Sequence, residues 1–173
     1  ATKKREIIRF GISEMEAANA EHPKILKNIL ILSRLYRQVA QEDPEYAQKA
    51  ENLLNEARNV YPQRPELMLA LAEVQMIQKN FPHADEGNRL LLEQAPEYLK
   101  NDVLMQAARL ALYRKELTLA FRFLREAERR GYKIYQDLEF VRVLAETLPW
   151  KAIVGDEVIE YIDRAAVLTQ NPE

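Results

Sequence analysis

The residues that could carry out catalysis are few and poorly placed. The two histidines, His22 and His83, each adjoin a proline, which is typical of surface turns. Asp85 and Glu86 follow His83, but adjacent residues on a helix do not converge on one ligand. The chain has no Cys, and its four glycines are isolated, so it offers no thiol nucleophile and no Gly-rich phosphate loop. We therefore expect no active site, no metal site and no cofactor.

Charge and hydropathy exclude two further classes of function. The 25 Lys and Arg residues nearly balance the 27 Asp and Glu residues, so no net positive field is available for nucleic acid. A stripe of arginines between 122 and 130 is interleaved with Glu126 and Glu128, which is typical of a solvated helix face. The longest aliphatic run, Ile29-Leu30-Ile31-Leu32, is far shorter than the roughly 20 residues of a membrane span. We expect no nucleic-acid partner and no direct membrane insertion.

The elements that would position any functional residue are helices arranged as a repeat. Low Gly content and abundant Ala, Leu, Glu, Lys and Arg favour helix throughout. Three segments share small and apolar residues at one spacing, first at intervals of 34 residues and then of 36: Ala50, Leu54, Ala57 and Pro62; Ala84, Asn88, Leu91 and Pro96; Ala120, Leu124, Ala127 and Tyr132. A second helical pattern precedes two of them: Met68, Leu71, Ala72 and Gln75; Leu104, Ala107, Ala108 and Ala111. The repeating unit is predicted to be helix–turn–helix.

This spacing resembles the tetratricopeptide repeat (TPR). Ala72 and Ala108 stand where that family has Gly, at points where two helix backbones approach each other. Ala50, Ala84 and Ala120 stand where it has Ala. The chain departs from the family pattern in lacking its first-position Trp and in placing Asn88 where an aromatic residue is expected. The resemblance implies an all-α fold, a TPR-like right-handed superhelix (α-solenoid) of antiparallel helix pairs, with about nine helices.

In this register the whole chain, residues 1–173, is one TPR-like domain. It divides into a half-repeat helix (1–23), repeat 1 (24–63), repeat 2 (64–98), repeat 3 (99–133) and a divergent repeat 4 (134–173). Because the register opens on a half-repeat, we expect the chain to be a domain excised from a longer protein, and the composition suggests a soluble segment that is cytoplasmic or attached to a membrane protein.

The TPR resemblance implies a concave groove lined by the first helix of each pair, which would bind a peptide or another protein segment. Transferred to this sequence, the groove residues are Lys27, Leu30, Arg34, Arg37 and Gln38 in repeat 1; Glu66, Leu69, Glu73, Met76 and Ile77 in repeat 2; and Asp102, Met105, Arg109, Leu112 and Tyr113 in repeat 3. Met76, Met105 and Leu112 could equally pack between repeats. The positions with which some TPR domains grip acidic chaperone tails hold Leu30, Arg34, Ala70, Asp102 and Gln106 here, so that clamp is absent.

Two other functions remain open. The stretch from Asp43 to Pro65 looks like the soluble repeat tail of some bacterial O-antigen ligase and polymerase-like membrane glycan enzymes, in which case the chemistry would reside in a membrane portion. Alternatively, the chain is a self-association module that forms a homodimer through its terminal helices. The first helix carries Ile7, Ile8, Ile12 and Met15, and the last carries Val154, Val158, Ile159, Ile162 and Val167.

Overall fold

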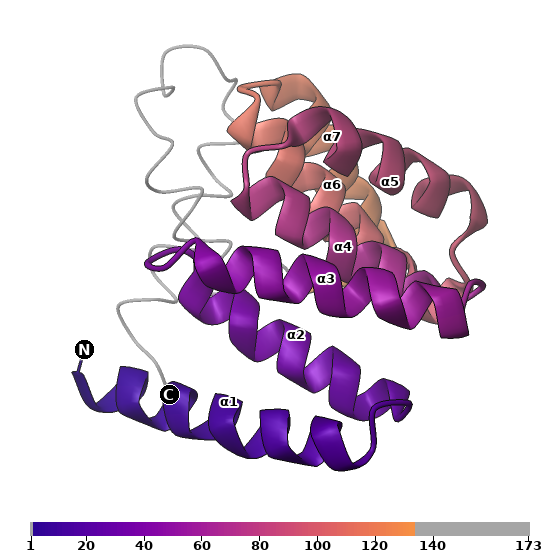
Figure 1. Ribbon diagram of the computed structural model, residues 1–173. Helices are drawn as coiled ribbons and strands as arrows, with labels where there is room; N and C mark the ends of the chain where they lie inside the picture. The colour runs from indigo at the N-terminus through magenta and orange to yellow at the C-terminus, as the bar shows by residue number, and fades with distance from the viewer. Residues whose placement is uncertain (1, 134–173) are drawn as a thin grey trace. The chain divides into compact units, whose positions relative to one another are not determined.

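The computed structural model describes residues 2–133, which form helices joined by short turns, with no strand in that range (Figure 1). The all-α class predicted from composition is therefore confirmed for this part of the chain. The helices are α1 (Thr2–Glu21), α2 (Leu26–Ala40), α3 (Glu45–Val60), α4 (Pro65–Ile77), α5 (Phe81–Gln94), α6 (Lys100–Tyr113) and α7 (Leu117–Arg129), with the 3-10 turn η1 (Glu97–Leu99) before α6. The divergent repeat 4 and the predicted last helix lie outside the described residues.

The first helices α4 and α6 end in the same way. Lys79 and Lys115 adopt left-handed backbone conformations, with φ of 59° and 63°. The next amide in each turn donates to the carbonyl five residues earlier: Asn80 to Gln75 and Glu116 to Ala111, both at 2.8 Å. This is the hydrogen-bond pattern of a Schellman motif, which ends a helix and turns the chain back on itself. Two lysines, rather than glycines, thus adopt the left-handed conformation at equivalent positions after α4 and α6.

The chain separates into two compact units, residues 1–106 and 107–173, with the boundary inside α6. In the first unit each helix packs against the next, from α1 on α2 to α4 on α5, and α2 also contacts α4. Figure 1 shows α1 at the outer edge of this stack. The contact between α2 and α4 brings these two, the first helices of predicted repeats 1 and 2, side by side. In the second unit the described residues are the remainder of α6, α7 and the turn that follows it.

The small and apolar residues at the predicted repeat positions are buried in all three described segments. The three repeat positions on α3, α5 and α7 are at most 2% exposed: Ala50, Leu54 and Ala57; Ala84, Asn88 and Leu91; Ala120, Leu124 and Ala127. On the first helices, Ser33, Ala72 and Ala108 are equally buried. A Cβ atom built on Gly87 of α5 would lie 3.5 Å from the Cβ of Ala72 on α4, so these two backbones approach closely. The predicted role of small side chains, to let helices meet, holds at this crossing.

Candidate interaction surfaces

Residues that sequence analysis assigned to a groove lie on α2 and α4, two helices that pack against each other. Lys27 and Arg34 of α2 are exposed, and Leu30 is half-buried between them. On α4, Glu66, Leu69 and Glu73 are half-buried. We call these residues, together with Arg37, the first-helix face. Gln38, at the end of α2, is exposed beside it, whereas Ile77 is half-buried at the end of α4.

Arg37, in the last turn of α2, and Glu73 of α4 neutralise each other where these two helices meet. The Arg37 Nη2 atom lies 3.0 Å from Glu73 Oε2, and Nη1 donates to the Ala70 carbonyl at 3.4 Å. Burial lowers the pKa of Arg37, while the Glu73 carboxylate opposes that shift and the nearby Arg34 guanidinium adds to it. Because Arg37 is engaged, the unpaired positive charge of the face belongs to Lys27 and Arg34.

The α4 side of the face is held by contacts to η1 and α6 within the first compact unit. The Tyr98 hydroxyl donates to Glu66 Oε1 at 2.6 Å, which raises the pKa of the phenol. Gln106, which is buried, donates from Nε2 to the Leu69 carbonyl at 3.2 Å. The second carboxylate oxygen of Glu66, Oε2, is buried and has no hydrogen-bond partner among the residues described. Glu66 is therefore held against η1, and its second oxygen is closed off from solvent.

Three predicted groove residues lie in the protein interior. Met76 is 9% exposed, Met105 3% and Leu112 1%. Of the two interpretations left open for these side chains, packing between helices fits their burial. These three side chains therefore contribute to the core and are not accessible to a partner. The accessible apolar surface of the first-helix face comes from Leu30 and Leu69.

The predicted groove residues of the third repeat divide between the two units. Asp102 lies in the first unit and is exposed, whereas half-buried Arg109 and exposed Tyr113 lie in the second. All three take part in interactions within the protein. The first-helix face therefore comprises residues of α2 and α4 only.

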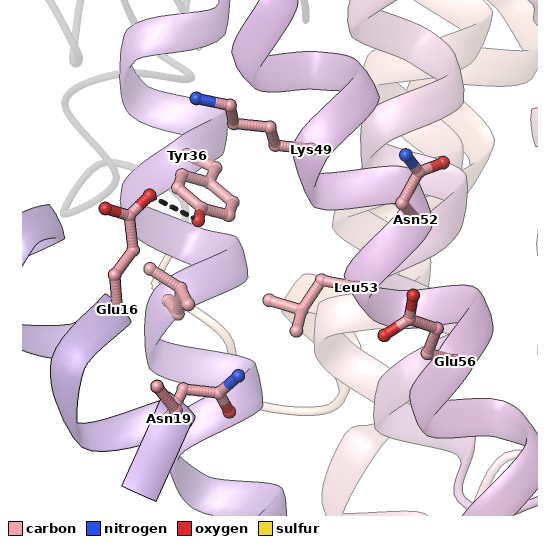
Figure 2. A pocket seen from close by; sticks show the side chains of 9 residues that line it. Glu16, Asn19, Tyr36, Lys49, Asn52, Leu53 and Glu56 are labelled. Atoms are coloured by element: carbon pink, nitrogen blue, oxygen red, sulfur yellow. Dashed lines mark hydrogen bonds between the residues drawn. The ribbon is translucent and has the colours of Figure 1, made fainter. Parts of the chain in front are cut away.

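A second surface, which sequence analysis did not predict, is an open groove of about 380 Å³ on the first unit (Figure 2). Its lining residues come from three helices: Glu16, Asn19 and Ala20 of α1, Leu32 and Tyr36 of α2, and Lys49, Asn52, Leu53 and Glu56 of α3. On an ideal helix Leu32 and Tyr36 lie on the opposite side of α2 from Leu30 and Arg34. The groove is therefore distinct from the first-helix face.

Internal contacts satisfy much of the polar lining of this groove. The Tyr36 hydroxyl donates to Glu16 Oε1 at 2.7 Å, as Figure 2 shows, and burial together with this bond raises the pKa of Tyr36. Lys49 Nζ lies 3.1 Å from Glu45 Oε1 and 4.9 Å from the Tyr46 ring centroid. Asn52 Oδ1 accepts from Gln48 at 3.1 Å. The individual polar positions, spaced three or four residues apart, are visible in the sequence, but nothing there indicates that α1 and α3 face each other across α2.

The described residues offer no catalytic constellation. His22 and His83 are exposed, and His83 Nδ1 lies 2.9 Å from Asn80 Oδ1 in the first turn of α5. Ser33 is fully buried and donates to the Leu30 carbonyl at 2.9 Å, which is a packing role. Between residues 2 and 133 no group of three His, Asp or Glu side chains could hold a metal ion. Within the same range, no helix has the length and apolar character to cross a membrane.

What the geometry of residues 2–133 defines is an all-helical protein with two candidate surfaces. No known protein family, curated protein or solved structure matches this chain.

Proposed function

We propose that this chain is a non-catalytic protein-interaction scaffold of the TPR type, which binds an extended or helical segment of a partner protein on its first-helix face. In this proposal the antiparallel helix pairs continue through residues 134–173 to give about nine helices in a right-handed superhelix. The observation that carries it is the direct packing of α2 on α4, which in this proposal are the first helices of successive pairs.

The repeated burial of small residues supports this architecture. Ala50, Ala84 and Ala120 are each completely buried, at equivalent positions on three second helices. Ser33, Ala72 and Ala108 occupy equivalent buried positions on three first helices. A regular array needs such equivalence, because every unit must meet its neighbour through the same kind of contact. A rigid array of this kind loses little conformational entropy when it binds a flexible segment.

The charges left on the first-helix face favour a partner segment of particular chemistry. Lys27 and Arg34 are exposed and have no ion pair among the described residues. Half-buried Leu30 and Leu69 offer apolar area on the same face. A segment that combines acidic residues with a few large apolar residues would satisfy the cations and cover the leucines. Charge complementarity would fix its direction along the helices.

A peptide selection tests the proposal without a known partner. The 173-residue chain is used to select from a phage-displayed library of random peptides, and one enriched peptide is titrated by fluorescence anisotropy. Combining Lys27→Glu with Arg34→Glu is expected to weaken binding by about tenfold or more. The matched control is Arg58→Glu, because Arg58 is an exposed arginine on the second helix α3. A selection without binders, or equal affinity for the wild-type chain and the double variant, would count against this face.

A further inference from the structure

The outer side of α1 carries apolar side chains that no described helix covers. Ile12 is buried, and Ile8 and Met15 pack against the same core cluster, so one side of α1 is committed to its contact with α2. In contrast, Ile7 is 63% exposed and Phe10 is 67% exposed. Two large apolar residues one helical turn apart on the exposed side of an edge helix indicate a contact surface.

These two residues belong to a longer stripe with coiled-coil spacing. Lys3, Ile7, Phe10 and Glu14 follow one another at intervals of four, three and four residues, and all four are exposed. Intervals of this kind place side chains in one line along a helix and allow it to pair with another helix. We call these four residues the α1 stripe.

The charges of the α1 stripe are complementary to those of a second copy. Lys3 at one end and Glu14 at the other have opposite signs, and neither has an ion-pair partner among the described residues. Arg5, on a different side of α1, is held by Glu42 at 2.7 Å and is not available. When two α1 helices run antiparallel, Lys3 of each copy lies opposite Glu14 of the other, and Ile7 lies opposite Phe10. A parallel pairing would instead set Lys3 against Lys3.

We propose that the α1 stripe binds the α1 stripe of a second copy of this chain in an antiparallel, two-fold symmetric contact. The symmetry repeats each pair, giving two ion pairs around a central cluster of two Ile7 and two Phe10 side chains. A contact of one helix face per copy is at the small end of specific interfaces. We therefore expect a dissociation constant of about 10–500 µM for the dimer. This surface is separate from the first-helix face, and the proposal goes beyond the scaffold function.

Charge reversal tests the pairing directly. Analytical ultracentrifugation of the 173-residue chain between about 5 and 500 µM is expected to show a monomer that converts to a dimer. Lys3→Glu alone or Glu14→Lys alone should each raise the dissociation constant about tenfold, because each places like charges together twice. The combination of both substitutions should restore dimerisation, since the ion pairs re-form with their signs exchanged. Arg9→Glu, which changes an exposed arginine of α1 outside the stripe, is the matched control.

The central cluster provides a second and independent variant. Phe10→Ser removes an exposed ring and should abolish the dimer, while circular dichroism shows an unchanged helical fold. A chain that stays monomeric at every concentration would overturn the proposal. It would also fail if the doubly reversed chain dimerised no better than the single variants, or if Phe10→Ser left the dissociation constant unchanged. Peptide binding to the first-helix face is measured separately, with Lys27 and Arg34 variants that should leave the dimer intact.

Discussion

Arg37 of α2 and Glu73 of α4 form an ion pair across the two first helices, with 3.0 Å between Nη2 and Oε2. The Arg37 side chain is only 15% exposed, and its second terminal nitrogen donates to the Ala70 carbonyl. Both partners had been assigned to a groove, where each was expected to meet a bound segment. In the folded chain they meet each other, and the pair links successive helix pairs.

Removal of Arg37 should destabilise the fold. Arg37→Ala is expected to lower the free energy of unfolding by about 1–3 kcal/mol, because a half-buried Glu73 carboxylate and the Ala70 carbonyl lose their donors. Glu73→Gln alone should cost less, since an amide oxygen still accepts from Arg37. Urea unfolding of the single and double variants measures the coupling between the two side chains, expected at about 1 kcal/mol. Simple additivity would show that the pair contributes nothing.

Asn88 is a weak point of the core. It is 2% exposed, and neither atom of its side-chain amide has a hydrogen-bond partner among the described residues. Leu54 and Leu124 occupy the equivalent buried positions on α3 and α7. Asn88→Leu should therefore raise the free energy of unfolding by about 1–3 kcal/mol, the usual cost of an unsatisfied buried polar group.

The reciprocal change supplies the control for Asn88. Leu54→Asn should destabilise the chain by at least as much as Asn88→Leu stabilises it, because it introduces an amide into the same apolar register. Thermal unfolding followed by circular dichroism compares the two variants. A lower unfolding temperature for Asn88→Leu would mean that the amide makes a stabilising contact.

Gly87 tests how closely α4 and α5 approach. A methyl group there would stand at an ordinary van der Waals distance from the Ala72 Cβ atom, 3.5 Å away. Gly87→Ala should therefore be tolerated and should stabilise α5 by about 0.5–1 kcal/mol, since alanine restricts the unfolded chain and favours helix. Gly87→Leu should destabilise by about 1–3 kcal/mol through overpacking. Urea unfolding separates the outcomes, and equal stability of both variants would argue that the helices are not in close contact.

Tyr36 should make stability depend on alkaline pH. Burial, and then the hydrogen bond to Glu16, raise its pKa above the ordinary value of about 10. Above about pH 10 the unfolded chain loses the phenolic proton while the folded chain keeps it, so the free energy of unfolding falls as pH rises. Below about pH 10 this contribution is fully present.

Tyr36→Phe checks the sign of this dependence. The variant should be less stable at neutral pH by about 1 kcal/mol, because the bond to Glu16 is lost. Its stability should also fall less steeply than that of the wild-type chain between about pH 10 and 12. Urea unfolding at several pH values measures both effects. Parallel stability curves for the two proteins would show that Tyr36 ionises equally readily in both states.

The helical class and the buried small residues followed from the sequence because they depend on short-range effects. Helix propensity acts residue by residue, and the 3.6-residue period shows which side of a helix is apolar. The shared spacing of Ala50, Ala84 and Ala120 therefore indicated three equivalent buried positions, and the structure buries all three. The sequence also showed that Asn88 departs from the TPR pattern. It did not show that the Asn88 amide has no hydrogen-bond partner among the described residues.

The tertiary structure decided which side chains meet. It paired Arg37 with Glu73, placed Met76 and Met105 inside, and formed the open groove that Glu16, Tyr36 and Asn52 line together. Periodicity gives the angle of a residue about its own helix axis, but it does not give the rotation and offset of one helix against another. Those offsets result from packing over many side chains at once, and a shift of a few ångströms separates an ion pair from two exposed charges.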